Sequence, residues 1–158
     1  MRPADVLTQP EAKIDLGGIA ARILYFGPAH THGDTLVYVE PDGVLLPGDI
    51  VQIRFFPDIP DNSGSANNWL VMLDKLEALH PRIIIPDHGS FPADPSYIGK
   101  ERDYLAALKS RVIQLKQQGK SAEEAGKILT PEFQSKYPDW GGAPGIAAVT
   151  QRFYEELP

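Results

Sequence analysis

The chain has 158 residues, a net charge of −6 at pH 7 and no cysteine, with 42% hydrophobic and 23% charged residues. This length and composition are typical of one soluble globular domain with its own core, and the lack of cysteine excludes disulfides, thiol catalysis and thiolate metal sites. The scattered acidic residues disfavour nucleic acid, which requires a basic patch, and they also disfavour an anionic membrane surface.

The first third of the sequence predicts a β-meander. Short runs rich in β-branched and aromatic residues are separated by turn sequences such as "LGG" and "PDG". The expected strands span residues 13–18, 19–26, 35–40 and 44–47.

The middle of the chain predicts a long loop followed by a helix and a strand. Residues 50–66 are irregular, and such a loop inside a compact domain is usually functional or mobile. We interpret "NSGSANN" in this region as a flexible loop on the substrate side. Residues 67–80 then show apolar side chains at helical spacing, and three isoleucines at 83–85 predict a strand covered on both faces of the sheet.

The last third predicts three helices. Pro95 at a first helical position begins a helix that ends before Gly119, and Ser121 with Glu124 forms a capping box for a shorter helix. The expected helices span residues 95–118, 121–129 and 146–157, with the turn-rich "KYPDWGGAPG" before the last one.

These elements predict a single domain over residues 1–158. Residues 1–92 would form the meander and the βαβ unit, and residues 93–158 would form the C-terminal helices. No apolar run approaches the roughly 18 residues of a transmembrane helix, and the N-terminus has no apolar signal-peptide core. A cytoplasmic location is therefore the default expectation.

Three polar residues follow predicted strands at the point where each strand ends. They are His30, Asp49 and His88. Ligands gather at strand ends in open α/β sheets, and imidazole and carboxylate groups suit zinc, iron or manganese. Spacing alone leaves the alternative open that each of them is an ordinary surface or capping residue.

Taken together, the segments "GPAHTHGD", "LLPGDIV" and "IIIPDHG" resemble the second half of the metallo-β-lactamase superfamily, over residues 13–90. The resemblance implies an α/β fold that is half of an αββα sandwich. One mixed β-sheet would carry covering helices and a C-terminal helical extension. His30 would ligate a first metal, His88 would ligate a second, and Asp49 would bridge the two metals as the residue on which catalysis depends.

The resemblance also assigns residues around these ligands. Thr31, Gly33 and Asp34 match residues that shape the first loop, whereas His32 falls at a variable position and is expected to have no metal role. Asp87 replaces the glycine that usually precedes the final histidine, which adds a carboxylate near the site.

The defining motif of the family, His-x-His-x-Asp-His, is not found in this sequence. His30-Thr31-His32 has its first spacing, but Asp34 is followed by Thr35, so only three of seven expected ligands are present. About half of the fold is thus expected to be absent before Met1. We therefore expect at most one ion, of zinc, iron or manganese, held by His30, Asp49 and His88 with a water.

Two functions follow from these expectations. In the first, the chain is a metal-dependent hydrolase of a small-molecule ester, thioester, lactone or β-lactam, in which a metal-bound hydroxide attacks, and it is incomplete or inactive in isolation. In the second, it is a non-catalytic half-domain that acts as a dimerisation or binding module.

The predicted sheet also bears on assembly. Its strands carry enough apolar side chains to require cover on a second face. We expect a homodimer or a partner that supplies the missing half, and the alternative is that the C-terminal helices fold back over the sheet.

Overall fold

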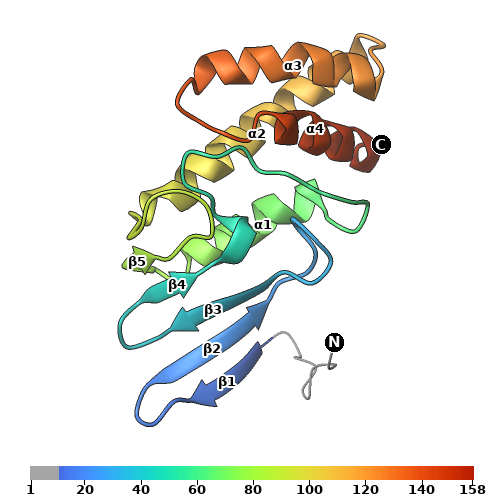
Figure 1. The fold of residues 1–158 in the computed structure, drawn as a ribbon. Helices are drawn as coiled ribbons and strands as arrows, with labels where there is room; N and C mark the ends of the chain where they lie inside the picture. Colours follow the sequence, from blue (N-terminus) through green and yellow to red (C-terminus); the bar gives the residue numbers. More distant parts are fainter. Residues whose placement is uncertain (1–10) are drawn as a thin grey trace.

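The computed structural model describes residues 11–158, which form one five-stranded sheet and four α-helices (Figure 1). The first four strands form an antiparallel meander, and the fifth pairs with the fourth in parallel, so the expected α/β fold with one mixed sheet is confirmed. In the order in which they lie in the sheet, the strands are β1 (Glu11–Asp15), β2 (Ala20–Tyr25), β3 (Thr35–Val39), β4 (Val44–Leu46) and β5 (Ile83–Ile84).

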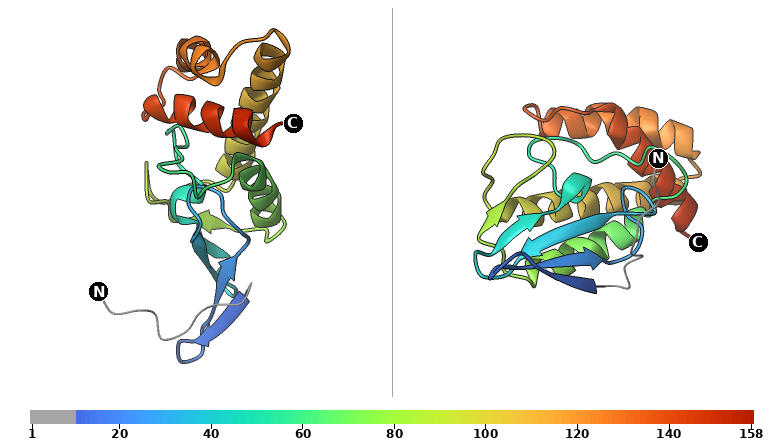
Figure 2. Two further views of the ribbon diagram at one scale, coloured as in Figure 1. Left: turned by 90° about the vertical axis from the view of Figure 1, so that its right-hand side faces the viewer. Right: turned by 60° about the horizontal axis from the view of Figure 1, so that its bottom comes forward.

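Helix α1 (Ala66–Glu77) covers one face of the sheet. The register pairs Leu24 with Leu36 and Tyr38 with Leu45, and these four side chains are buried. Trp69, Met72, Leu73 and Leu76 of α1 are also fully buried. The left view of Figure 2 shows α1, in green, to one side of the strands.

The remaining helices are α2 (Ser96–Gln117), α3 (Ala122–Lys136) and α4 (Pro144–Glu156). The end expected for α3 at residue 129 is wrong, because the helix continues through Pro131 to Lys136. Proline removes one helical hydrogen bond, but Phe133 beyond it is fully buried. Burial of this aromatic side chain outweighs the local cost.

The start of α1 is hydrogen-bonded to the end of α4. The Glu156 carboxylate accepts the backbone N–H groups of Ala66 and Asn67, at 3.2 and 2.8 Å. These N–H groups have no partner within the helix. The C-terminal helix therefore caps a helix that begins 90 residues earlier in the chain.

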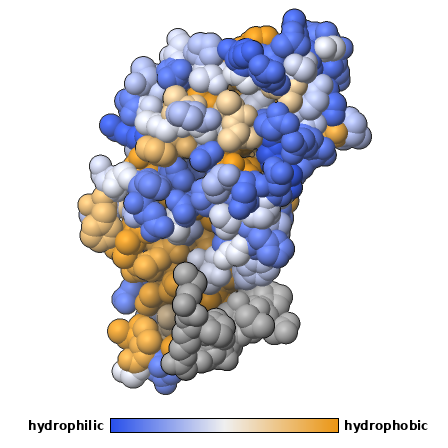
Figure 3. Space-filling model, turned by 45° about the vertical axis from the view of Figure 1, so that its right-hand side comes forward, coloured by the Kyte–Doolittle hydropathy of each residue, from blue (hydrophilic) through white to orange (hydrophobic). Residues whose placement is uncertain are grey.

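The other face of the sheet is apolar and only partly covered. Ile14 and Ile83 are 44% and 40% exposed, and Ile23, Val37 and Leu46 between them are half-buried. The register places the last three side by side on this face, and Figure 3 shows apolar surface gathered over the strands. The expectation that the isoleucine strand is covered on both faces is wrong, because α1 packs on the opposite side and Ile83 on this face is 40% exposed.

The long loop at 51–65 packs partly into the core. Val51, Ile53, Phe56 and Ile59 are buried. Its "NSGSANN" portion is a loop only in part, since α1 begins at Ala66. Among residues 11–158, no helix has the length and apolar character needed to cross a membrane.

Candidate metal-binding site

Asp49 lies between the two histidines that the sequence predicts as ligands. Its Oδ2 atom is 3.7 Å from His30 Nε2, and its Oδ1 atom is 3.2 Å from His88 Nε2. His30 follows β2, Asp49 follows β4 and His88 follows β5. Three loops from one edge of the sheet thus bring the three side chains together. A hollow of about 270 Å³ adjoins two of them, His30 and Asp49, and is also lined by Asp34 and Asp87, among others.

The tautomer of His30 is set by its other ring nitrogen. His30 Nδ1 lies within hydrogen-bond distance of the carbonyl oxygen of Asp58. A carbonyl oxygen only accepts, so Nδ1 must donate, and in the neutral ring Nε2 carries the lone pair. That lone pair and the Asp49 carboxylate are two acceptors facing each other, an arrangement that a cation or a proton between them would satisfy.

The His30 loop is held by Asp34 from within. The Asp34 carboxylate accepts the backbone N–H groups of Ala29 and Thr31 and the hydroxyl of Thr31, at 2.7 to 3.1 Å. The side chain of Asn68 on α1 also donates to the carbonyls of Phe26 and Pro28, at 3.1 and 2.8 Å. Asp34 and Thr31 therefore shape the loop that presents His30, and the oxygens of Asp34 are engaged in doing so.

Two buried side chains hold the Asp49 loop. Trp69 Nε1 donates to the carbonyl of Ile50 at 3.0 Å, and Gln52 Nε2 donates to the carbonyl of Asp49 at 3.2 Å. The loop itself is a single 3₁₀ turn over Gly48–Ile50. The Asp49 carboxylate remains about one-third exposed, which leaves it accessible to solvent.

His88 is the most exposed of the three side chains. Phe55 stacks on its ring, with centroids 5.1 Å apart and an interplanar angle of 13°. Ile53 N–H donates to the carbonyl of His88 at 3.0 Å, and a Cβ added to Gly89 would overlap the Ile53 carbonyl. His32 is exposed, and among the described residues no ion pair joins it to Asp49.

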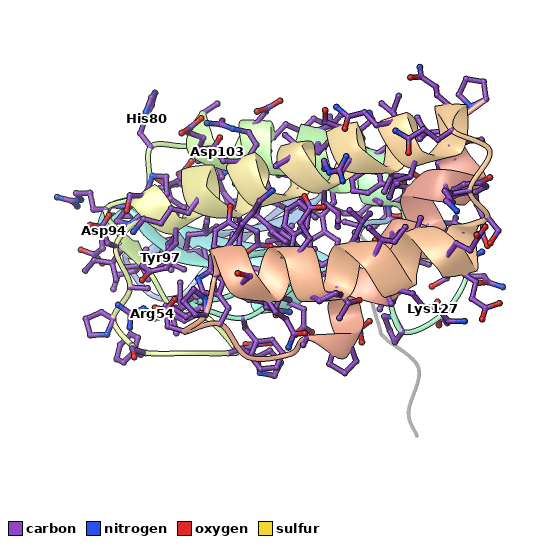
Figure 4. The ribbon with its side chains drawn as sticks, turned by 90° about the horizontal axis from the view of Figure 1, so that it is seen from above. Arg54, His80, Asp94, Tyr97, Asp103 and Lys127 are labelled. Carbon is purple, nitrogen blue, oxygen red and sulfur yellow. The ribbon has the colours of Figure 1, made fainter. Side chains whose placement is uncertain are left out.

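Arg54 directly precedes Phe55, the aromatic residue that stacks on His88. Arg54 has a φ of 57°, which is uncommon outside glycine, and its Nε lies 3.4 Å from Asp139 Oδ2. A hydrogen bond with Tyr97 raises the pKa of Arg54. Figure 4 shows Arg54 and Tyr97 at the same end of the molecule, away from Lys127.

The donor atoms are compatible with part of a zinc site. Two ligand atoms about 2.1 Å from a tetrahedral zinc ion are roughly 3.4 Å apart, which lies between the 3.2 and 3.7 Å measured here. The two histidines approach different oxygens of the carboxylate. Within residues 11–158, no group of three or more His, Asp or Glu side chains is arranged so that it could hold a metal ion.

Four supporting contacts were not predicted from the sequence. They involve the Asp58 carbonyl, Asn68, Gln52 and Trp69. The apolar character of Trp69 indicates only a place in the helix core. Asn67 and Asn68 before an apolar run are the one available signal, because two amide side chains at the start of a helix have hydrogen bonds to make.

Comparison with protein families identifies the fold. The model of the Metallo-beta-lactamase superfamily matches residues 1–88, which is more than half of the chain. This chain belongs to the metallo-β-lactamase superfamily. The resemblance seen in its three strand-end segments is thereby confirmed. No curated protein matches the sequence.

Solved structures agree with the superfamily fold. A metallo-β-lactamase family protein from Thermus thermophilus matches with a TM-score of 0.70 and 20% identity, over 98% of this chain and 50% of that chain. The stereoselective inverting sec-alkylsulfatase Pisa1 from Pseudomonas sp. matches with a TM-score of 0.71 and 17% identity, over 96% of this chain and 26% of that chain.

A metallo-β-lactamase from Pontibacter korlensis also matches, with a TM-score of 0.56 and 19% identity, over 65% of this chain and 48% of that chain. At these identities the likeness establishes the fold alone. The chain spans between about a quarter and a half of the length of these structures. It therefore presents a partial metallo-β-lactamase fold, consisting of one mixed sheet and four helices.

Proposed function

We propose that this chain carries part of the site of a metal-dependent hydrolase that acts on a small-molecule ester, thioester, lactone or β-lactam. The observation that carries the proposal is the position of Asp49 between the Nε2 atoms of His30 and His88. His30, Asp49 and His88 would hold one zinc ion, or one iron or manganese ion. A bound zinc ion would supply Lewis-acid activation of water and of the scissile group.

Other residues of this chain position and orient the three proposed ligands. Asp58 fixes the tautomer of His30, Gln52 and Trp69 hold the turn that presents Asp49, and Phe55 orients the His88 ring. Three donors meet the minimum of a catalytic zinc site. They fall short of the seven that the superfamily resemblance implies. We therefore expect the 158-residue chain to be incomplete as a catalyst by itself.

Metal binding provides the first test. Calorimetric titration with zinc, together with metal analysis of the purified chain, is expected to give at most one ion per chain. Binding is expected to be lost in His88→Ala and in Asp49→Ala. His32→Ala is the matched control, because it removes an exposed histidine from the loop that carries His30 and leaves all three proposed ligands in place. Two tightly bound ions per chain would contradict the proposed ligand count.

Hydrolysis provides the second test. With thioester, lactone and β-lactam substrates, we expect the chain to turn over no faster than free zinc, because the sequence supplies only three of the seven expected ligands. Zinc-dependent turnover that Asp49→Ala abolishes would instead support a complete mononuclear site.

The apolar sheet face favours a second candidate function, that of a non-catalytic half-domain that dimerises. Ile14, Ile23, Val37, Leu46 and Ile83 form this face. Contiguous apolar surface on a folded protein marks an interaction site, and we propose a second copy of the chain as its occupant. In a twofold dimer the same face serves both copies.

A further inference from the structure

Helix α2 places an acidic side chain inside the core, behind the Asp49 loop. Glu101 is 1% exposed, and its Oε2 atom accepts the backbone N–H of Gln52 at 2.7 Å. Its other oxygen, Oε1, is buried without a hydrogen-bond partner among the described residues. The neighbouring core positions on the same helix are apolar, as at Ile98, Leu105 and Leu108.

The hydrogen bond from Gln52 to Glu101 is connected to two of the proposed ligands, Asp49 and His88. Gln52 donates its side-chain amide to the carbonyl of Asp49, and the next residue, Ile53, donates its N–H to the carbonyl of His88. The segment Gln52–Ile53 thus links the two loops that carry Asp49 and His88. A shift of Gln52 would move both loops relative to each other.

Core packing alone would not call for a carboxyl group at this position. Burying a carboxyl group is costly, and only one of its two oxygens has a partner among the described residues. An apolar side chain would fill the same space, but it would leave the buried N–H of Gln52 without an acceptor. The specific contribution of Glu101 is therefore to fix the Gln52 amide.

We propose that Glu101 is a positioning residue, which holds the Gln52 amide and thereby keeps Asp49 between His30 and His88. This inference rests on the proposed metal-dependent function. Burial raises the pKa of the Glu101 carboxyl well above its ordinary value. Its Oε2 atom accepts the N–H of Gln52.

The test compares variants of Glu101 by two measurements, zinc affinity in calorimetry and hydrogen exchange of the Gln52 amide. Glu101→Leu removes the acceptor and is expected to weaken zinc binding by roughly 10- to 100-fold, as for other groups that orient a ligand. It is also expected to expose the Gln52 amide to exchange. Glu101→Gln keeps an acceptor oxygen and is expected to preserve both the zinc affinity and the protection of the amide.

A further variant separates positioning from stability. Leu108→Ala should lower the melting temperature without changing zinc affinity. If Glu101→Leu does not fold, Glu101→Asp takes its place, since a side chain shorter by one methylene group cannot reach Gln52 in the same way.

The test distinguishes failure of the positioning role of Glu101 from failure of the proposed metal-dependent function. If the unmodified chain binds no zinc, the metal proposal fails, and exchange of the Gln52 amide still reports on positioning. Loss of protection in the leucine or aspartate variant, with retention in Glu101→Gln, supports the positioning role. Zinc affinity and Gln52 protection that stay unchanged when the acceptor is removed would overturn it.

Discussion

At the scale of single residues, the candidate site depends on groups outside the three proposed ligands. Gly64 is an example, because a Cβ at this position would overlap the carbonyl oxygens of Ala29 and His30. Only glycine lets the chain pass so close beneath the His30 loop. The position of a proposed ligand is thus set partly by the absence of a side chain elsewhere.

Glu101 leads to a prediction for the pH dependence of stability. The carboxyl group titrates near 4.5 in the unfolded chain, whereas burial raises its pKa in the folded chain. Between these two values the group is ionised only in the unfolded state, so unfolding releases a proton and the free energy of unfolding falls as pH rises. Glu101→Gln removes this proton release.

As the pH rises above 4.5, the pKa of the Glu101 carboxyl in the unfolded chain, we therefore expect Glu101→Gln to gain stability relative to the unmodified chain. Urea unfolding at about pH 4 and about pH 7 measures the difference between the two proteins. A difference of the same size at both pH values would show that Glu101 ionises alike in the folded and unfolded states.

At the scale of elements, α3 carries a proline in its interior. Pro131 is exposed and lies between the buried residues Leu129 and Phe133. Proline is about 3 kcal/mol less favourable than alanine inside a helix. We expect Pro131→Ala to raise the free energy of unfolding by up to about 3 kcal/mol, measured by urea unfolding.

The matched control for this prediction replaces an exposed residue other than proline by alanine. Gln134→Ala lies about one turn further along the same helix and should change stability by only a few tenths of a kcal/mol. No gain from Pro131→Ala would mean that the helix has already adapted its geometry to the proline.

The capping box of α3 was predictable because its signal is local. Ser121 Oγ accepts the N–H of Glu124 at 3.2 Å, and the Glu124 carboxylate accepts the N–H of Ser121 at 2.9 Å. Two residues three positions apart contain all the information that this cap needs. The order of strands and helices was predictable for the same reason, since each element has its own apolar period.

The supports of the site were not predictable in this way. Glu101 and Gln52 are 49 residues apart, and His30 and Asp58 are 28 residues apart. Neither pair has a periodic signature, because each contact exists only after the helices have packed against the loops. The predicted end of α3 at residue 129 was wrong, because burial of Phe133 keeps the chain helical beyond Pro131.

At the scale of the whole molecule, the apolar sheet face predicts self-association. Burying this face removes apolar side chains from water, at roughly 25 cal/mol per Å². We expect the chain to sediment as a dimer at micromolar concentration. Ile83→Lys, which places a charge on the face, should shift it towards a 17.4 kDa monomer.

Val71→Lys is the matched control for this prediction. Val71 is 48% exposed, close to the 40% of Ile83, but it lies on α1 and not on the sheet. It should leave the dimer intact. A stable monomer of the unmodified chain would rule out the second copy as the occupant of this face.

The cap that Glu156 places on α1 has a consequence for the order of folding during synthesis. Ser65, just before α1, donates its N–H to the carbonyl of Ala29, next to His30. The start of α1 is therefore bonded both to the His30 loop and to a residue 90 positions further along. Contacts this distant in sequence form late, because the chain must first close a long loop. While the ribosome is still translating α4, the sheet and α1 can already have formed, but their junction beside His30 lacks its last bond. Completion of the cap on α1, beside the His30 loop, thus requires α4 to have been synthesised.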